Sequence, residues 1–150
     1  MKSLFNAIDN NEIINRIEKL TPSSKAEWGK MTVSQVLEHC QQPLKVAFNE
    51  LKLKRSLVGI LFGKMAKKQL TVNDDPFKKN LPTAKQFIIK DQPDFNKAKA
   101  KLISLVKMFA EKGPEGISKH PHPFFGHMTV HEWNKLMFKH LDHHLRQFGV

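Results

Sequence analysis

The chain has 150 residues, 40% of them hydrophobic, and carries a formal net charge of +11. This length accommodates one domain, over residues 1–150, with a core that needs no disulfide, and the lone cysteine, Cys40, excludes an internal one. No apolar run approaches the roughly 20 residues of a membrane-spanning helix and no secretory signal is visible, so we expect a soluble, cytoplasmic protein with no membrane partner.

Two helices are predicted in the first third of the chain. The first covers about residues 10–20, where isoleucine and leucine recur at helical spacing. The second runs from Val33 into the fifties. Thr32 precedes this helix and Gln35 lies in its first turn. Together they form the pattern of a capping box, in which each side chain satisfies a backbone amide of the other residue. Pro43 should bend this helix, either to adjust packing or to shape a site.

The middle of the chain is predicted to contain one short helix and a long connection. Residues 56–68 place apolar side chains at helical intervals, and residues 74–83 have the Asp and Pro content of a loop. Residues 87–89 indicate either a short strand or an extended apolar segment that seals the core. If the apolar residues of 57–65 are exposed, they offer a surface through which subunits could pair as a homodimer.

Two further long helices complete the pattern. One starts after Asp94 as N-cap and ends before Gly113-Pro114. The other follows a proline-stiffened loop over residues 119–126 and begins at a capping box formed by Thr129 and Glu132. Four long amphipathic helices with one extended crossover predict an all-α fold. We expect an antiparallel four-helix bundle with a short extra helix in the middle.

The positive charge gathers in the central stretch between Lys52 and Lys79. Clustered lysine and arginine bind nucleic acid by releasing counterions from phosphate. However, no RNA-binding signature and no helix-turn-helix pattern accompany the cluster. We interpret the stretch as a solvated basic face, and nucleic-acid binding is the alternative that is not favoured.

Seven of the eight histidines lie between His120 and His144. His140 and His144 are four residues apart, so on a helix they share a face and can bind one metal ion together. That face also carries Trp133 and turns toward the bundle interior, whereas His143 points elsewhere. Two inward imidazoles are either hydrogen-bonded core residues or ligands of a metal ion that satisfies both.

A short repeat supplies a third histidine. Residues 126–130, Gly-His-Met-Thr-Val, echo residues 29–33, Gly-Lys-Met-Thr-Val, and each copy opens a predicted helix. Counted from the capping threonine, His39 is the seventh residue and His140 the eleventh, so they emerge on corresponding faces one turn apart. If the two helices are neighbours, His39, His140 and His144 form a metal site. Three imidazoles leave coordination positions open for water or substrate, which is typical of a catalytic site.

The remaining candidates are weaker. His122, in the loop before the terminal helix, either overhangs the site as a proton shuttle or substrate contact, or only caps and packs. His127 and His131 lie where a cation opposes the helix dipole, so we assign them neutral surface roles. No carboxylate is placed as a general base, since Glu38 and Asp142 both point away from the histidine face.

Several blocks of this sequence together resemble a subfamily named domain of unknown function 1569, within the DinB-like superfamily of metalloenzymes, also called YfiT-like. The resemblance spans nearly the whole chain. It implies a four-helix bundle and a divalent metal held by three histidines from two helices, which by position are His39, His140 and His144. The blocks that carry it are Trp28-Gly29-Lys30-Met31-Thr32, Leu37-Glu38-His39-Cys40, His122-Pro123-Phe124-Phe125-Gly126, Glu132-Trp133 and His140-Leu141-Asp142-His143-His144-Leu145-Arg146-Gln147-Phe148-Gly149.

The resemblance also implies a kind of activity. Some DinB-like relatives resemble metal-dependent transferases that add a low-molecular-weight thiol to an electrophile, and others have been regarded as hydrolases. We therefore expect an enzyme in which Zn or Ni activates water or a small thiol, for transfer to or hydrolysis of a small molecule. The alternative is a non-enzymatic binding protein that uses the basic stretch for nucleic acid or the bundle cavity for a small ligand.

Overall fold

A computed structural model describes residues 2–150, and within them it contains five α-helices, two short 3₁₀ turns and no β-strand. The predicted all-α fold is confirmed. None of the helices in this part of the chain combines the length and the apolar content needed to cross a membrane. The helices are α1 (Ala7–Lys19), α2 (Val33–Ala47), α3 (Leu57–Thr71), α4 (Phe95–Lys112) and α5 (Val130–Gln147), and the 3₁₀ turns are η1 (Lys85–Phe87) and η2 (Pro114–Gly116).

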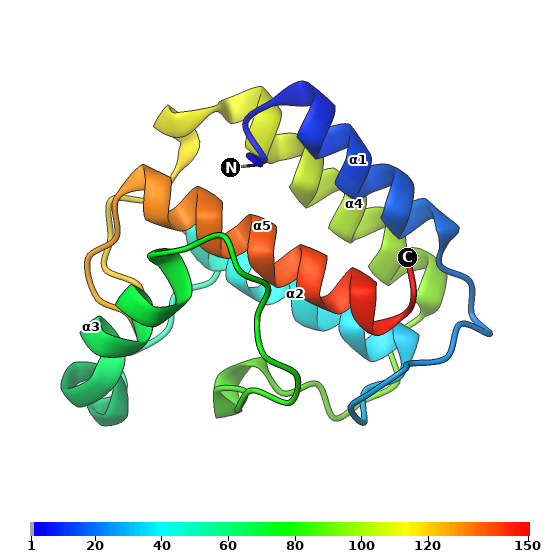
Figure 1. Ribbon diagram of the computed structural model, residues 1–150, viewed down its shortest axis with the longest axis horizontal. Helices are drawn as coiled ribbons and strands as arrows, with labels where there is room; N and C mark the ends of the chain where they lie inside the picture. The colour runs from blue at the N-terminus through cyan, green and yellow to red at the C-terminus, as the bar shows by residue number, and fades with distance from the viewer. Residues whose placement is uncertain (1) are drawn as a thin grey trace.

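The four long helices form a ring in which α1 and α2 each lie beside both α4 and α5 (Figure 1). The side chain of Asn10 in α1 donates to the carbonyl of Val106 near the end of α4, so these helices are antiparallel, as are α2 and α5. The side chain of Gln41 in α2 donates to the carbonyl of Ala98 near the start of α4. The predicted long crossover, with α3 as the extra helix, thus returns the chain so that α2 and α4 run parallel.

The helix starts follow the predicted caps. The hydroxyls of Thr32 and Thr129 each accept a hydrogen bond from the amide three residues later. The side chains of Gln35 and Glu132 accept from the amides of the two threonines in return, so both predicted capping boxes are present. Asp94 caps α4 as expected. Satisfied first-turn amides fix the rotational setting of α2 and α5, and with it the direction of every side chain that follows.

The predicted end of the second helix is wrong. α2 was expected to reach the fifties but ends at Ala47, because Asn49 adopts a left-handed φ of 60° and the amide of Glu50 turns back to the carbonyl of Lys45. Of the two alternatives for residues 87–89, the structure contains the extended segment and not the strand: η1 ends at Phe87 and the backbone then continues extended. Since no neighbouring strand pairs with it, the segment belongs to the long connection.

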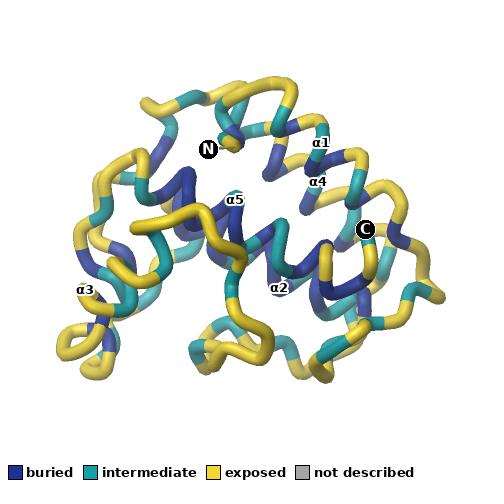
Figure 2. The backbone as a smooth tube through the Cα atoms, viewed as in Figure 1, coloured by how far each residue is buried: buried dark blue, intermediate teal, exposed yellow. Residues whose placement is uncertain are grey.

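Buried residues occur on each of the four long helices (Figure 2) and make up one apolar core. Its largest fully buried side chains come from all four long helices and include Ile17, Leu37, Phe109 and Trp133. Burying each such side chain stabilises the fold by roughly 1.5–3 kcal/mol. Apolar packing therefore supplies the main contact among the four long helices.

α3 lies outside the ring (Figures 1 and 2), and two of its glycines contact the loop that precedes α5. Gly59 and Gly63, one turn apart, face the backbone of Phe124, and a Cβ at Gly63 would lie 2.0 Å from the carbonyl oxygen of Phe124. Lys67 adds an ion pair of 2.9 Å with Glu132 in α5. The helix is thus held by close backbone approach in its first two turns, by polar contacts, and by Leu70, which packs against the core in its last turn.

We expect Gly63→Ala to destabilise the protein by about 1–3 kcal/mol, because the added methyl group must displace the backbone around Phe124. This expected net loss already includes the gain of about 1 kcal/mol from alanine's higher helix propensity. Urea unfolding measures the difference, and proteolysis within α3 reports its detachment. Lys64→Ala, at the exposed neighbouring position, is the control and should shift stability by less than about 0.5 kcal/mol. Equal stability of Gly63→Ala and the wild type would contradict the close approach.

Candidate metal centre

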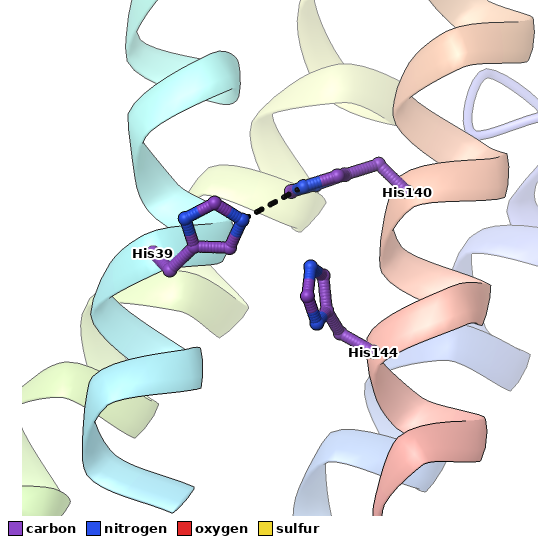
Figure 3. Close-up of side chains that lie close together, drawn as sticks. All are labelled: His39, His140 and His144. Atoms are coloured by element: carbon purple, nitrogen blue, oxygen red, sulfur yellow. Dashed lines mark hydrogen bonds between the residues drawn. The ribbon is translucent and has the colours of Figure 1, made fainter. Parts of the chain in front are cut away.

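Three histidine rings converge between α2 and α5 (Figure 3). α2 supplies His39, and α5 supplies His140 and His144 one turn apart. One ring nitrogen of each residue lies within 4.8 Å of the other two. Among the described residues, this group of candidate metal ligands contains three histidines and no carboxylate. The structure therefore brings together the three residues that the sequence had selected.

The spacing of the ring nitrogens suits a cation. Nε2 of His39 lies 3.0 Å from Nε2 of His140. Two nitrogens bound tetrahedrally to one zinc ion at 2.0–2.1 Å are about 3.3 Å apart. Nitrogen lone pairs at this separation repel each other unless a proton or a cation lies between them. The pair is thus close to the geometry in which one ion contacts both rings.

Hydrogen bonds on the outer side of two rings fix which nitrogen faces the centre. Nδ1 of His39 lies 2.9 Å from the carbonyl oxygen of Phe87 in η1, which can only accept, so Nδ1 carries the proton. The side chain of Gln147 donates from Nε2 to the carbonyl of Trp28, which turns its Oε1 to Nδ1 of His144 at 2.8 Å. His144 therefore also donates from Nδ1. Both rings present an unprotonated Nε2 to the centre, as metal-ligating histidines with outer partners do.

These outer partners were missed from the sequence. Phe87 acts through its backbone carbonyl, so its side-chain identity carries no signal. Gln147 was not among the candidate site residues. Its position three residues after His144 places it on the same helical face, and this spacing was a signal that could have identified it.

Burial keeps the three imidazoles neutral. His39 and His144 are buried and His140 is partly exposed. Burial is the main reason why the pKa of each ring is lowered, and repulsion among the rings adds to it in His140. For His144, burial and repulsion from His39 lower the pKa to about 3. Near neutral pH the rings are therefore in the form that coordinates metal, and the site reaches solvent on the side of His140.

An aromatic group borders the site. The ring of His143 lies edge-on against His144 with centroids 5.1 Å apart, and it also contacts Trp28 at 5.9 Å and Phe77 at 6.0 Å. The sequence predicted that His143 points away from the face of His140 and His144. Its contacts place it beside the triad, between the candidate ligand His144 and two apolar rings.

The nearby carboxylates are engaged in ion pairs. Asp142 pairs with Arg16 of α1 and with Arg146, at 2.8 Å each, so it links two helices of the bundle. Glu38 pairs with Lys45 at 3.3 Å. Neither carboxylate belongs to the group of candidate ligands. The structure thus offers no acidic general base beside the three rings.

His122 is packed in the loop before α5. Its Nδ1 accepts the amides of Phe124 and Phe125 at 3.0 and 3.1 Å, and its ring packs on Phe125 and Trp133. Trp133 precedes His140 by two helical turns, or about 10 Å along the axis. The contacts of His122 are therefore those of a buried residue that organises the loop.

Comparisons with known proteins give one match. The family model described as "Protein of unknown function (DUF1569)" matches residues 2–149. No curated protein and no solved structure matches the chain. The chemistry of the site must therefore be argued from the residues themselves.

We expect His122 to make stability depend on pH. Burial lowers its pKa from 6.5 to about 4, so the unfolded chain takes up a proton between these values while the folded chain does not. The contribution of neutral His122 to the free energy of unfolding is complete above pH 6.5 and is lost as the pH falls to 4. His122→Asn keeps an acceptor for the loop amides but does not titrate. The free energy of unfolding of the wild type should fall by about 3 kcal/mol more than that of the variant over this range. Parallel pH profiles would contradict this assignment.

We expect Gln147→Met to weaken zinc binding by about 10–100-fold, because Nδ1 of His144 loses the acceptor that orients its ring. Competition with a chromophoric chelator measures the dissociation constant. Gln41→Met is the matched control, since Gln41 is also a buried amide on a bundle helix but donates to Ala98. Equal zinc affinity in wild type and Gln147→Met would show that the outer hydrogen bond does not position the ligand.

Proposed function

We propose that this chain, which belongs to the DUF1569 family, is a metal-dependent enzyme of the DinB-like kind that acts on a small molecule. The observation that carries the proposal is the convergence of His39, His140 and His144, whose candidate ligand atoms lie within 4.8 Å of one another. The outward hydrogen bonds of His39 and His144 support it, because they leave Nε2 free to coordinate.

Two features favour a catalytic over a structural role for the site. The bundle has an apolar core contributed by all four long helices, so its folding does not require a metal. Three neutral ligands also leave coordination positions open, and His140 is partly exposed. Imidazole ligands suit Zn or Ni. A divalent ion in this position would polarise an oxygen or lower the pKa of a coordinating water or thiol.

The surrounding residues favour a thiol as the nucleophile. Asp142 and Glu38 are engaged in ion pairs, so no carboxylate beside the triad takes a proton from water. A thiol, with a pKa of about 8.5, loses its proton far more readily than water. In the proposed transfer, sulfur bonds to an electrophilic carbon, the leaving group departs with its electron pair, and the thiol proton passes to solvent. Trp28, Phe77 and His143 provide apolar surface for the organic part of a substrate.

Elemental analysis of protein purified without a histidine tag tests the metal site. We expect about one equivalent of Zn or Ni, as one three-histidine site requires. His140→Ala should lose at least about tenfold in metal affinity while keeping the helical content of the wild type. His131→Ala, an exposed histidine on the same helix, is the matched control and should retain the metal. A protein that neither carries nor takes up a divalent metal would end the enzyme proposal and favour a binding protein.

The reaction class is tested separately on the metal-loaded protein. A panel of low-molecular-weight thiols is combined with alkyl halide and epoxide electrophiles, and products are identified by mass spectrometry. A conjugate that requires both the thiol and His140 supports transfer. Cleavage of esters or amides without thiol supports hydrolysis instead. Binding of a small ligand without turnover would favour the non-enzymatic alternative.

A further inference from the structure

α3 turns most of its large apolar side chains toward solvent, whereas a helix on a protein surface usually turns them toward the core. Its inward face is made by Gly59 and Gly63. At about 100° per residue, most of its large apolar side chains fall on the opposite, outward arc, whereas Leu70 in the last turn lies on the inward side and packs against the core. The most exposed of them are Leu57 at 80%, Leu61 at 75% and Met65 at 68%. Val58 and Phe62, 58% and 52% exposed, widen this arc. These five residues, called the outer face of α3 below, cover no part of the bundle core.

Positive charge borders the outer face. Residues 51–73 contain no aspartate or glutamate. Lys67 is the one basic residue in this stretch that the structure pairs with a carboxylate, that of Glu132. The other basic side chains of the stretch are exposed, and they are Lys52, Lys54, Arg55, Lys64 and Lys68. At about 100° per residue, Lys64 falls beside Leu57 at the edge of the outer face, and Lys68 falls within the same arc, one turn further along the helix.

We propose that α3 is a membrane-surface helix, which lies flat on an anionic lipid bilayer with its outer face among the acyl chains and its cations at the headgroups. An exposed apolar stripe flanked by lysine and arginine is the arrangement that such helices use. The expectation of no membrane partner rested on the absence of a spanning segment, and a helix that lies on the surface needs no such length.

Charge and shape favour a bilayer over other occupants. A second copy of the chain packed symmetrically on this face would bring the same five cations against themselves. Nucleic acid would match the cations but would leave Leu57, Leu61 and Met65 against phosphate and water. A peptide partner needs a groove, whereas the outer face is the convex side of a single helix that lies outside the ring (Figure 1).

Gly59 and Gly63 also explain how the bundle holds the helix in this orientation. Because they allow the backbone of α3 to approach Phe124 directly, the first two turns of the helix are anchored without large apolar side chains, and only Leu70 in the last turn packs against the core. The ion pair of Lys67 with Glu132 sits on the bundle side as well. Leu57 and Leu61 therefore remain directed away from the core.

Co-sedimentation with lipid vesicles tests the proposal on the full chain. We expect binding to vesicles of phosphatidylcholine and phosphatidylglycerol in equal parts, at least about tenfold weaker binding to pure phosphatidylcholine, and loss of binding at high salt. Leu61→Gln should weaken binding by about tenfold. Ile8→Gln on α1, where Ile8 is 79% exposed, is the matched control and should bind like the wild type.

Two matched double variants test the contribution of positive charge to vesicle binding. Lys64→Glu with Lys68→Glu should weaken binding to anionic vesicles by at least about tenfold. Lys97→Glu with Lys101→Glu, also exposed lysines one turn apart but on α4, makes the same change in net charge and should leave most binding intact. All four positions are exposed, so circular dichroism should show folded variants.

Three results would overturn the proposal. The first is absence of vesicle binding, or binding that Leu61→Gln leaves unchanged. The second is a concentration-dependent dimer that Leu61→Gln converts to monomer, which would assign the outer face to a second copy. The third is oligonucleotide binding that the double variant Lys64→Glu with Lys68→Glu abolishes and that Leu61→Gln does not affect. This result would assign the basic residues to nucleic acid.

Discussion

The placement of three neutral imidazoles side by side in a largely buried position is the constraint on which the site depends. Each ring has two nitrogens that need partners, and burial leaves no water to supply them freely. The chain satisfies His39 and His144 on their outer sides with the carbonyl of Phe87 and the side chain of Gln147. This requirement accounts for two features remote in sequence: the 3₁₀ turn that brings Phe87 to α2, and the anchoring of Gln147 by Trp28. The ring nitrogens that face the centre then have only each other as neighbouring polar atoms, and a cation shared among the three rings would satisfy them together.

The parts of this arrangement that follow from local rules could be predicted from the sequence. Thr32 and Thr129 start their helices by the same capping box, so the residue counts to His39 and His140 determine the face on which each ring emerges. The early end of α2 could not be predicted, because it depends on a left-handed Asn49 and not on the glycine that usually marks such an end. The outer partner of His39 could not be predicted either, since a backbone carbonyl is available at every residue and only the fold selects Phe87.

The direction of α3 illustrates a second limit of reasoning from periodicity. Apolar residues at helical spacing over 56–68 correctly predict a helix, but the usual assumption would turn those residues inward. Gly59 and Gly63 reverse the orientation, because the face without side chains is the one that approaches the backbone of Phe124 most closely. In the first two turns close approach replaces apolar burial as the means of attachment, and the large side chains of these turns are left on the outside.

α5 connects the two regions. Lys139, immediately before the candidate ligand His140, donates from Nζ to the carbonyl of Leu70 in the last turn of α3 and to that of Asn73 beyond it. A cation at this position satisfies carbonyls that the helix leaves without partners and interacts favourably with the helix dipole. Glu132 holds Lys67 on the same side of α3. Because α5 thus carries the paired histidines on its inner face and the anchors of α3 on another, the orientation of the exposed helix and the position of the histidine site are set by the same rigid element.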